Sequence, residues 1–196
     1  MQTIRGQVVY TGTDVLQDAC IQCDEGRIVS VTSEAQGQVA DTYPVITPAL
    51  IDAHSHIGLI RAGEPESEAE ANERMESMLA HADVLDSIQM DDDGFASSIE
   101  AGVLYSCVLP GSGNIIGGNS AIVRNYAQNT NSALIRRGGI KAAFGYNPMS
   151  TREWKGARPY TRMGALAILR TKLHAVRDKM EKERSKPDAD VSYPSE

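Results

Sequence analysis

The fold of this chain is decided by the stretch Val45-Ile46-Thr47-Pro48-Ala49-Leu50-Ile51-Asp52-Ala53-His54-Ser55-His56. Its apolar first half is typical of a buried strand that delivers the chain to the two histidines. Because side chains alternate between the two faces of a strand, Asp52, His54 and His56 are predicted to share one face. Two imidazoles about 6–7 Å apart along a strand can bind one divalent metal ion. The stretch therefore predicts half of a metal site at a strand end.

The residues on either side of this stretch follow two different patterns. Residues 3–47 are predicted to be β structure, with strands over 4–10, 19–23 and 27–31 and a turn at Asp24-Glu25-Gly26. After residue 45, β-rich runs alternate with helical patterns, which is typical of βαβ units around a parallel sheet. We therefore predict an α/β fold that begins with an all-β segment.

Helical periodicity predicts three helices after residue 62. The first covers residues 75–85, and the last covers 166–180, where apolar residues are spaced by three and four. Between them, Asp91-Asp92-Asp93 can cap a short helix that Gly102 ends, because acidic groups favour the positive N-terminus of a helix.

Two further strands and a glycine-rich loop are predicted among these helices. The β-rich run 103–109 lies between Gly102 and Pro110, which predicts a buried parallel strand, and 140–144 predicts another strand. The loop at 111–118 resembles a dinucleotide-binding loop but has one residue too many between its last glycines. Nucleotide or cofactor binding by this loop is kept as an alternative that a nucleotide titration would test.

The composition excludes several classes of function. With 41% hydrophobic and 23% charged residues the chain can bury a core, and its net charge of −7 argues against nucleic acid as a partner. No apolar run approaches the ~20 residues that span a bilayer, and the N-terminus lacks the apolar core of a secretory signal. Three cysteines are too few for a disulfide framework. We expect a cytoplasmic protein that binds neither nucleic acid nor membrane.

The stretch 46–56 resembles the signature of the amidohydrolase superfamily, which usually reads Thr-Pro-Gly-Leu/Phe-Ile-Asp-x-His-x-His, with Ala49 in place of the usual Gly. The hairpin at Glu25-Gly26-Arg27-Ile28 resembles the small β-sandwich domain of that superfamily. Three later segments are similar to the imidazolonepropionase-like branch: 101–103, 110–118 and 141–145. The resemblance covers nearly all of the chain.

The resemblance implies a β-sandwich segment over residues 1–47, followed over 48–196 by the N-terminal part of a (β/α)8 TIM-type barrel. It implies His54 and His56 as metal ligands, with Asp52 supporting them from the same strand face. The implied cofactor is a divalent metal ion, zinc first, with manganese and iron as alternatives. Such an ion lowers the pKa of a bound water. The implied function is metal-dependent hydrolysis of a non-peptide carbon–nitrogen bond in a small amide-like substrate.

Part of the implied site has no counterpart in this sequence. A complete barrel needs about 250 residues, whereas about 150 follow residue 47. The superfamily takes further histidines from the fifth and sixth strands and an aspartate from the eighth. Only His81 and His174 remain here, and we expect both to be structural residues on helices. The alternative to an incomplete hydrolase is a non-catalytic fragment or degenerate barrel that associates with a second chain or with itself.

Three further groups of residues are candidates for the site. The resemblance implies Gly-Glu-Asn-Pro where this chain has Gly145-Tyr146-Asn147-Pro148, so a neutral tyrosine stands in place of a candidate metal ligand. Lys141 could be a carbamylated bridging lysine, but we expect it at the beginning of its strand and therefore at the wrong end of the barrel. Arg152, Arg158 and Arg162 are either surface charges or include one that meets an anionic substrate.

Overall fold

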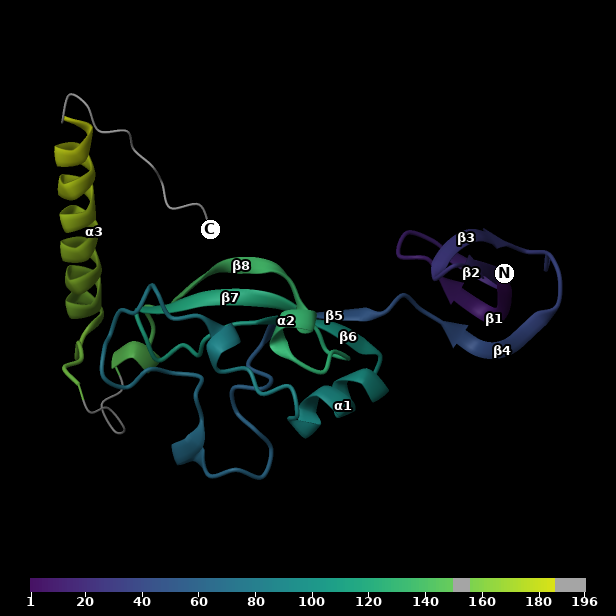
Figure 1. Cartoon of the computed structure of the whole chain (residues 1–196), viewed down its shortest axis with the longest axis horizontal. Coiled ribbons are helices and arrows are strands. Elements are labelled where there is room, and N and C mark those ends of the chain that lie inside the picture. Colours follow the sequence, from purple (N-terminus) through teal and green to yellow (C-terminus); the bar gives the residue numbers. More distant parts are fainter. Residues whose placement is uncertain (150–155, 186–196) are drawn as a thin grey trace. The chain divides into compact units, whose positions relative to one another are not determined.

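The computed structural model of the chain describes residues 1–149 and 156–185. The chain divides into two compact units, Met1–Leu50 and Ile51–Glu196. Two four-stranded sheets and a few helices make up the described residues (Figure 1). This mixture confirms the predicted α/β class. The (β/α)8 barrel itself stays a prediction.

Four strands form the sheet of the first unit: β1 (Gln2–Tyr10), β2 (Val15–Asp24), β3 (Arg27–Thr32) and β4 (Val39–Ile46). They lie in the order β3-β2-β1-β4, and β1 pairs antiparallel with β2 but parallel with β4. The predicted turn between β2 and β3 is present, with positive φ at Glu25 and Gly26, as a two-residue hairpin turn requires. The sheet is one layer, so the expected sandwich would need a further sheet from elsewhere.

Four more strands form the sheet of the second unit in the order of their sequence: β5 (Leu50–Ser55), β6 (Val103–Val108), β7 (Ile116–Arg124) and β8 (Leu134–Ala142). The sequence predicted that β6 is a parallel strand among βαβ units, and this is wrong for its pairing with β7. The strands β6 and β7 are antiparallel, and so are β7 and β8. The physical reason is the short connection, because residues 109–115 cannot form the crossover of a dozen or more residues that parallel neighbours need.

The helices are α1 (Asp93–Glu100), α2 (Thr130–Ala133) and α3 (Arg162–Arg184), with single 3-10 turns η1 (Glu66–Glu68), η2 (Val84–Asp86) and η3 (Asn147–Met149). The predicted cap of α1 is confirmed, since the Asp92 side chain accepts from the N–H of Gly94. Gly102 follows the helix with φ of +81°, a conformation that glycine adopts without strain.

The predicted helix over residues 75–85 is wrong. The backbone of this segment pairs with the strand β7 and the loop before it instead of with itself: the N–H of Leu79 donates to the carbonyl of Ile116, and Ala82 accepts from Asn119. Only η2 forms at its end. None of the helices within the described ranges is long and apolar enough to span a bilayer.

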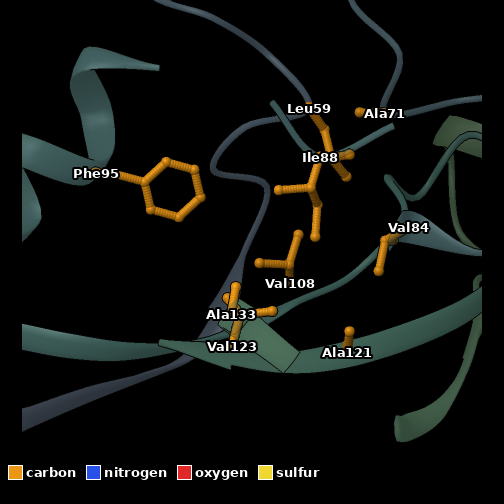
Figure 2. Packing of buried hydrophobic residues seen from close by; sticks show 9 residues of the cluster. All are labelled: Leu59, Ala71, Val84, Ile88, Phe95, Val108, Ala121, Val123 and Ala133. Atoms are coloured by element: carbon orange, nitrogen blue, oxygen red, sulfur yellow. The ribbon is translucent and has the colours of Figure 1, made fainter. Parts of the chain in front are cut away.

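Nine buried residues form the core of the second unit (Figure 2): Leu59, Ala71, Val84, Ile88, Phe95, Val108, Ala121, Val123 and Ala133. They come from the segment after β5, from α1, and from the strands β6 and β7 with α2. Leu59 is three residues beyond His56 and is 4% exposed. The core therefore anchors the chain directly after the histidine pair.

Candidate metal site at the histidine pair

The imidazoles of His54 and His56 lie side by side at the end of β5. Their ring centroids are 5.5 Å apart, and the ring planes meet at 81°. His54 is exposed and His56 is half-buried, so a ligand can reach the pair from solvent. The alternation of side chains along a strand accounts for this arrangement.

The ring of His56 is held by a backbone carbonyl. Its Nδ1 is 2.8 Å from the carbonyl oxygen of Leu109. Because a carbonyl oxygen only accepts, Nδ1 carries the proton and donates, which leaves the lone pair of Nε2 available. Metal-binding histidines are typically oriented in this way by an acceptor on the second ring nitrogen. The N–H of Leu109 also donates to the carbonyl of Ser55, at 2.9 Å, so Leu109 contacts the end of β5 through both backbone groups.

The ring of His54 contacts Lys141 on β8. The Nζ of Lys141 lies 3.3 Å from Nε2 of His54. A lysine ammonium only donates, so this ring nitrogen is the acceptor. The expectation that Lys141 lies at the beginning of its strand is wrong, because β8 runs from Leu134 to Ala142 and places Lys141 at its end.

The sequence predicts this strand over residues 140–144, directly after the Gly138-Gly139 pair. In the structure the strand continues through both glycines. A Cβ on Gly138 would lie 2.3 Å from Oγ of Ser120, and that hydroxyl donates to the carbonyl of Gly139 at 2.8 Å. The glycines therefore leave room for the side chain of Ser120 on the neighbouring strand β7, and they do not end β8.

Asp52 contacts the histidine pair through the backbone. Its Oδ1 accepts a hydrogen bond from the N–H of His54 at 3.0 Å. The carboxylate is exposed. Asp52 can therefore fix the backbone at the strand end, which is an indirect form of the support expected from the sequence.

The donors present fit one half of a metal site. Among residues 1–149 and 156–185, no three side chains of His, Cys, Asp or Glu lie close enough together to hold a metal ion. Two imidazole nitrogens are ligands that suit zinc and iron, whereas manganese prefers oxygen ligands. The donor set therefore favours zinc or iron, and further ligands would have to come from another part of the protein or from a second chain.

The other candidate residues lie elsewhere. His81 is exposed in a turn instead of on the expected helix, and His174 is exposed on α3, with Nδ1 3.2 Å from the guanidinium of Arg177. Tyr146 is 75% exposed.

Arg158 is engaged with the backbone. Its guanidinium donates to the carbonyls of Gly113, Pro148 and Glu73, and burial lowers its pKa to about 10. These contacts make Arg158 a link between loops, whereas the sequence left open whether it is a surface charge or meets an anionic substrate. Arg162 is exposed in the first turn of α3, and Arg152 lies outside the described residues.

The glycine-rich loop is fastened to the segment 71–77. The N–H groups of Gly111, Gly113 and Ile115 donate to that segment at 2.6 Å, 2.7 Å and 2.8 Å. The acceptor for Gly113 is Oδ1 of Asn72, and a Cβ on Gly111 would lie only 2.4 Å from the same oxygen. The glycines are thus explained by close packing, and three donors that a phosphate would need are already taken.

A pocket of about 590 Å³ opens beside this loop, lined mainly by the segment 67–87 together with Leu59, Pro110 and Gly117. Two acidic residues, Glu70 and Glu73, form part of its wall. The histidine pair is not among the residues that line this pocket, so the pocket is not assigned to the metal site.

No family model matches this sequence, and no curated protein matches it. The chain is similar in structure to an amidohydrolase from Thermotoga maritima MSB8, with a TM-score of 0.83 and 23% sequence identity. The match covers 98% of this chain and 52% of that one, so this chain spans about half the length of the solved protein. This agrees with the superfamily resemblance at the level of the fold and gives no support to the imidazolonepropionase-like branch. The chain therefore shares the fold of about half of an amidohydrolase.

Proposed function

We propose that this chain carries one half of the metal centre of a hydrolase that cleaves non-peptide carbon–nitrogen bonds in small amide-like substrates. His54 and His56 are its metal ligands. The observation that carries the proposal is the hydrogen bond from Nδ1 of His56 to the carbonyl of Leu109, which leaves the lone pair of Nε2 available for a cation. The likeness in fold to an amidohydrolase supports the reaction class.

A bound divalent ion would supply a water of lowered pKa and would polarise the substrate carbonyl. Other residues of this chain would position the two histidine ligands. Leu109 fixes the ring of His56, and Asp52 fixes the backbone of His54. Lys141 has to release Nε2 of His54 before that nitrogen can bind a cation, because one lone pair cannot serve both partners. The released ammonium could then donate to an oxyanion that develops on the substrate.

Metal binding by the purified chain tests this proposal. The chain, freed of metal with a chelator, is titrated with Zn²⁺ or Co²⁺, and the bound metal is counted by elemental analysis. We expect His54→Ala and His56→Ala each to weaken binding by at least tenfold. The matched controls are His81→Ala and His174→Ala, which remove exposed imidazoles elsewhere and should bind as the unchanged chain does. Equal binding by all four variants would refute the proposal.

A second candidate function is association with another chain, or with itself, to complete a barrel. The strands β5 and β8 are the two edges of the second sheet, and Ile51 and Ile140 on them are exposed. Open edges with apolar side chains favour pairing with another strand. Light scattering of the metal-free chain tests this candidate, which predicts association that persists in His54→Ala. A chain that stays monomeric at high concentration would argue against self-association.

A further inference from the structure

The helix α3 presents a narrow apolar seam that the described residues leave largely uncovered. Five residues form the seam with spacings of three and four, which is the pattern of a coiled-coil interface: Leu166, Leu169, Leu173, Val176 and Met180. The first two are half-buried, whereas the last three are 57%, 56% and 43% exposed. Every side chain from Arg170 to Ser185 is exposed. The C-terminal two thirds of α3 therefore lack a packing partner in the described structure.

Local interactions support this helix at its N-terminus and in its C-terminal half. Oγ1 of Thr161 caps the N-terminus by accepting from the N–H of Gly164 at 3.0 Å. Near the C-terminus, Arg177 and Lys179 form exposed ion pairs with Glu181 and Glu183, at 3.8 Å and 4.0 Å. Exposed pairs of this kind contribute little, and most helical stability in proteins comes from packing of the apolar face. The seam is the part of α3 whose burial would stabilise it.

The charges beside the seam restrict what can cover it. From Arg170 to the end of α3, the five positions that flank the seam, equivalent to e and g of a heptad, are all basic: Arg170, Lys172, Arg177, Lys179 and Arg184. Asp178 and Glu181 lie at outer positions of the helix. Two copies of α3 side by side would oppose like charges in either orientation, which disfavours pairing. Acidic flanks on the partner would be attracted instead.

We propose that α3 docks an amphipathic helix of a different protein chain, whose apolar seam is flanked by aspartate and glutamate. The apolar seams would bury each other, and the charged flanks would select this partner over a second copy of the same chain. The proposal is independent of the metal site, which lies on β5 and not on α3.

A charge-reversed copy of the full chain is the probe for this proposal. In it, the five basic flanking residues become glutamate, while Glu181→Lys and Glu183→Lys keep the pairs within the helix. Circular dichroism checks that the helix content is unchanged. A labelled unchanged chain is mixed with increasing amounts of either the charge-reversed copy or the unlabelled unchanged chain. Sedimentation then measures the affinity of the labelled chain for each of these two partners.

We expect the charge-reversed copy to bind at least tenfold more tightly than a second unchanged chain, with an affinity that falls as salt is raised. Leu173→Ser with Val176→Ser should abolish this preference. The matched control, Ile28→Ser with Val29→Ser, removes two exposed apolar side chains from β3 and should leave the preference intact. Equal binding to both partners, or a preference that survives loss of the seam, would overturn the proposal.

Discussion

Asp92 connects the helix α1 to the turn that follows the histidine pair, and its loss should be costly. The side chain is 6% exposed. Its Oδ1 accepts from the N–H of Gly94 and its Oδ2 from the N–H of Gly58, both at 3.0 Å. Asp92→Ala removes the N-cap, which costs about 0.5–2 kcal/mol. It also leaves the buried N–H of Gly58 without its acceptor, which costs about 1–3 kcal/mol. We expect the free energy of unfolding of the second unit to fall by about 2–4 kcal/mol.

Urea unfolding followed by far-UV circular dichroism measures this loss, and hydrogen exchange of the α1 amides assigns it to the second unit. Asp93→Ala is the matched control, because Asp93 is exposed in the same turn and its loss removes only a helix-dipole contribution of about 0.3–1 kcal/mol. Asp92→Asn retains one oxygen acceptor and should fall between the two. If Asp92→Ala costs no more than Asp93→Ala, the carboxylate does not hold these two segments together.

Other predictions follow from single contacts. Gly118→Ala should lower the free energy of unfolding by more than about 2 kcal/mol, because φ is +115° and the new Cβ would lie 2.4 Å from a backbone oxygen. The control Gly139→Ala, with open space around the new Cβ, should change the midpoint of urea unfolding little. Phe95→Ala, which empties part of the core, should lower the free energy of unfolding by about 3–5 kcal/mol in the same assay. A hydrogen bond from Arg5 holds the pKa of Asp18 below its ordinary value of 3.8. The contribution of this pair to the free energy of unfolding is therefore fully present above pH 3.8. It is lost as the pH falls through the lower pKa that Asp18 has in the folded state. Arg5→Ala should raise the midpoint of the Asp18 titration followed by carboxyl NMR, and an unmoved midpoint would contradict the assignment.

The parts of the fold that were predicted correctly depend on local chemistry. The cap at Asp92 and the positive φ of Gly102 bound α1, and both signals involve groups within a few residues of each other. The side-by-side arrangement of His54 and His56 likewise follows from the alternation along one strand. Such features depend mainly on residues close together in the sequence, so the sequence alone is enough to predict them.

The errors occurred where distant segments decide the local structure. Residues 75–85 have a helical pattern, yet their backbone groups are taken by β7, a strand that the sequence analysis did not predict. The contact between Lys141 and His54 joins residues 87 positions apart. Predicting this contact would have required the knowledge that β8 continues through two glycines. Pairing between strands that are remote in sequence leaves little local trace, because either partner alone could fit several structures.

The mixed pairing of β1 has a consequence for synthesis on the ribosome. β2 and β3 can join β1 as a meander early, but one side of β1 stays open until β4 has left the exit tunnel. Residues 1–50 then have every strand of their sheet, while the segments that would surround the imidazoles are still untranslated. We expect nascent chains stalled soon after this point to resist protease in their first 46 residues, and early digestion of that region would contradict this order of folding. The four-stranded sheet of the first unit would thus form before the histidine pair is able to bind a metal ion.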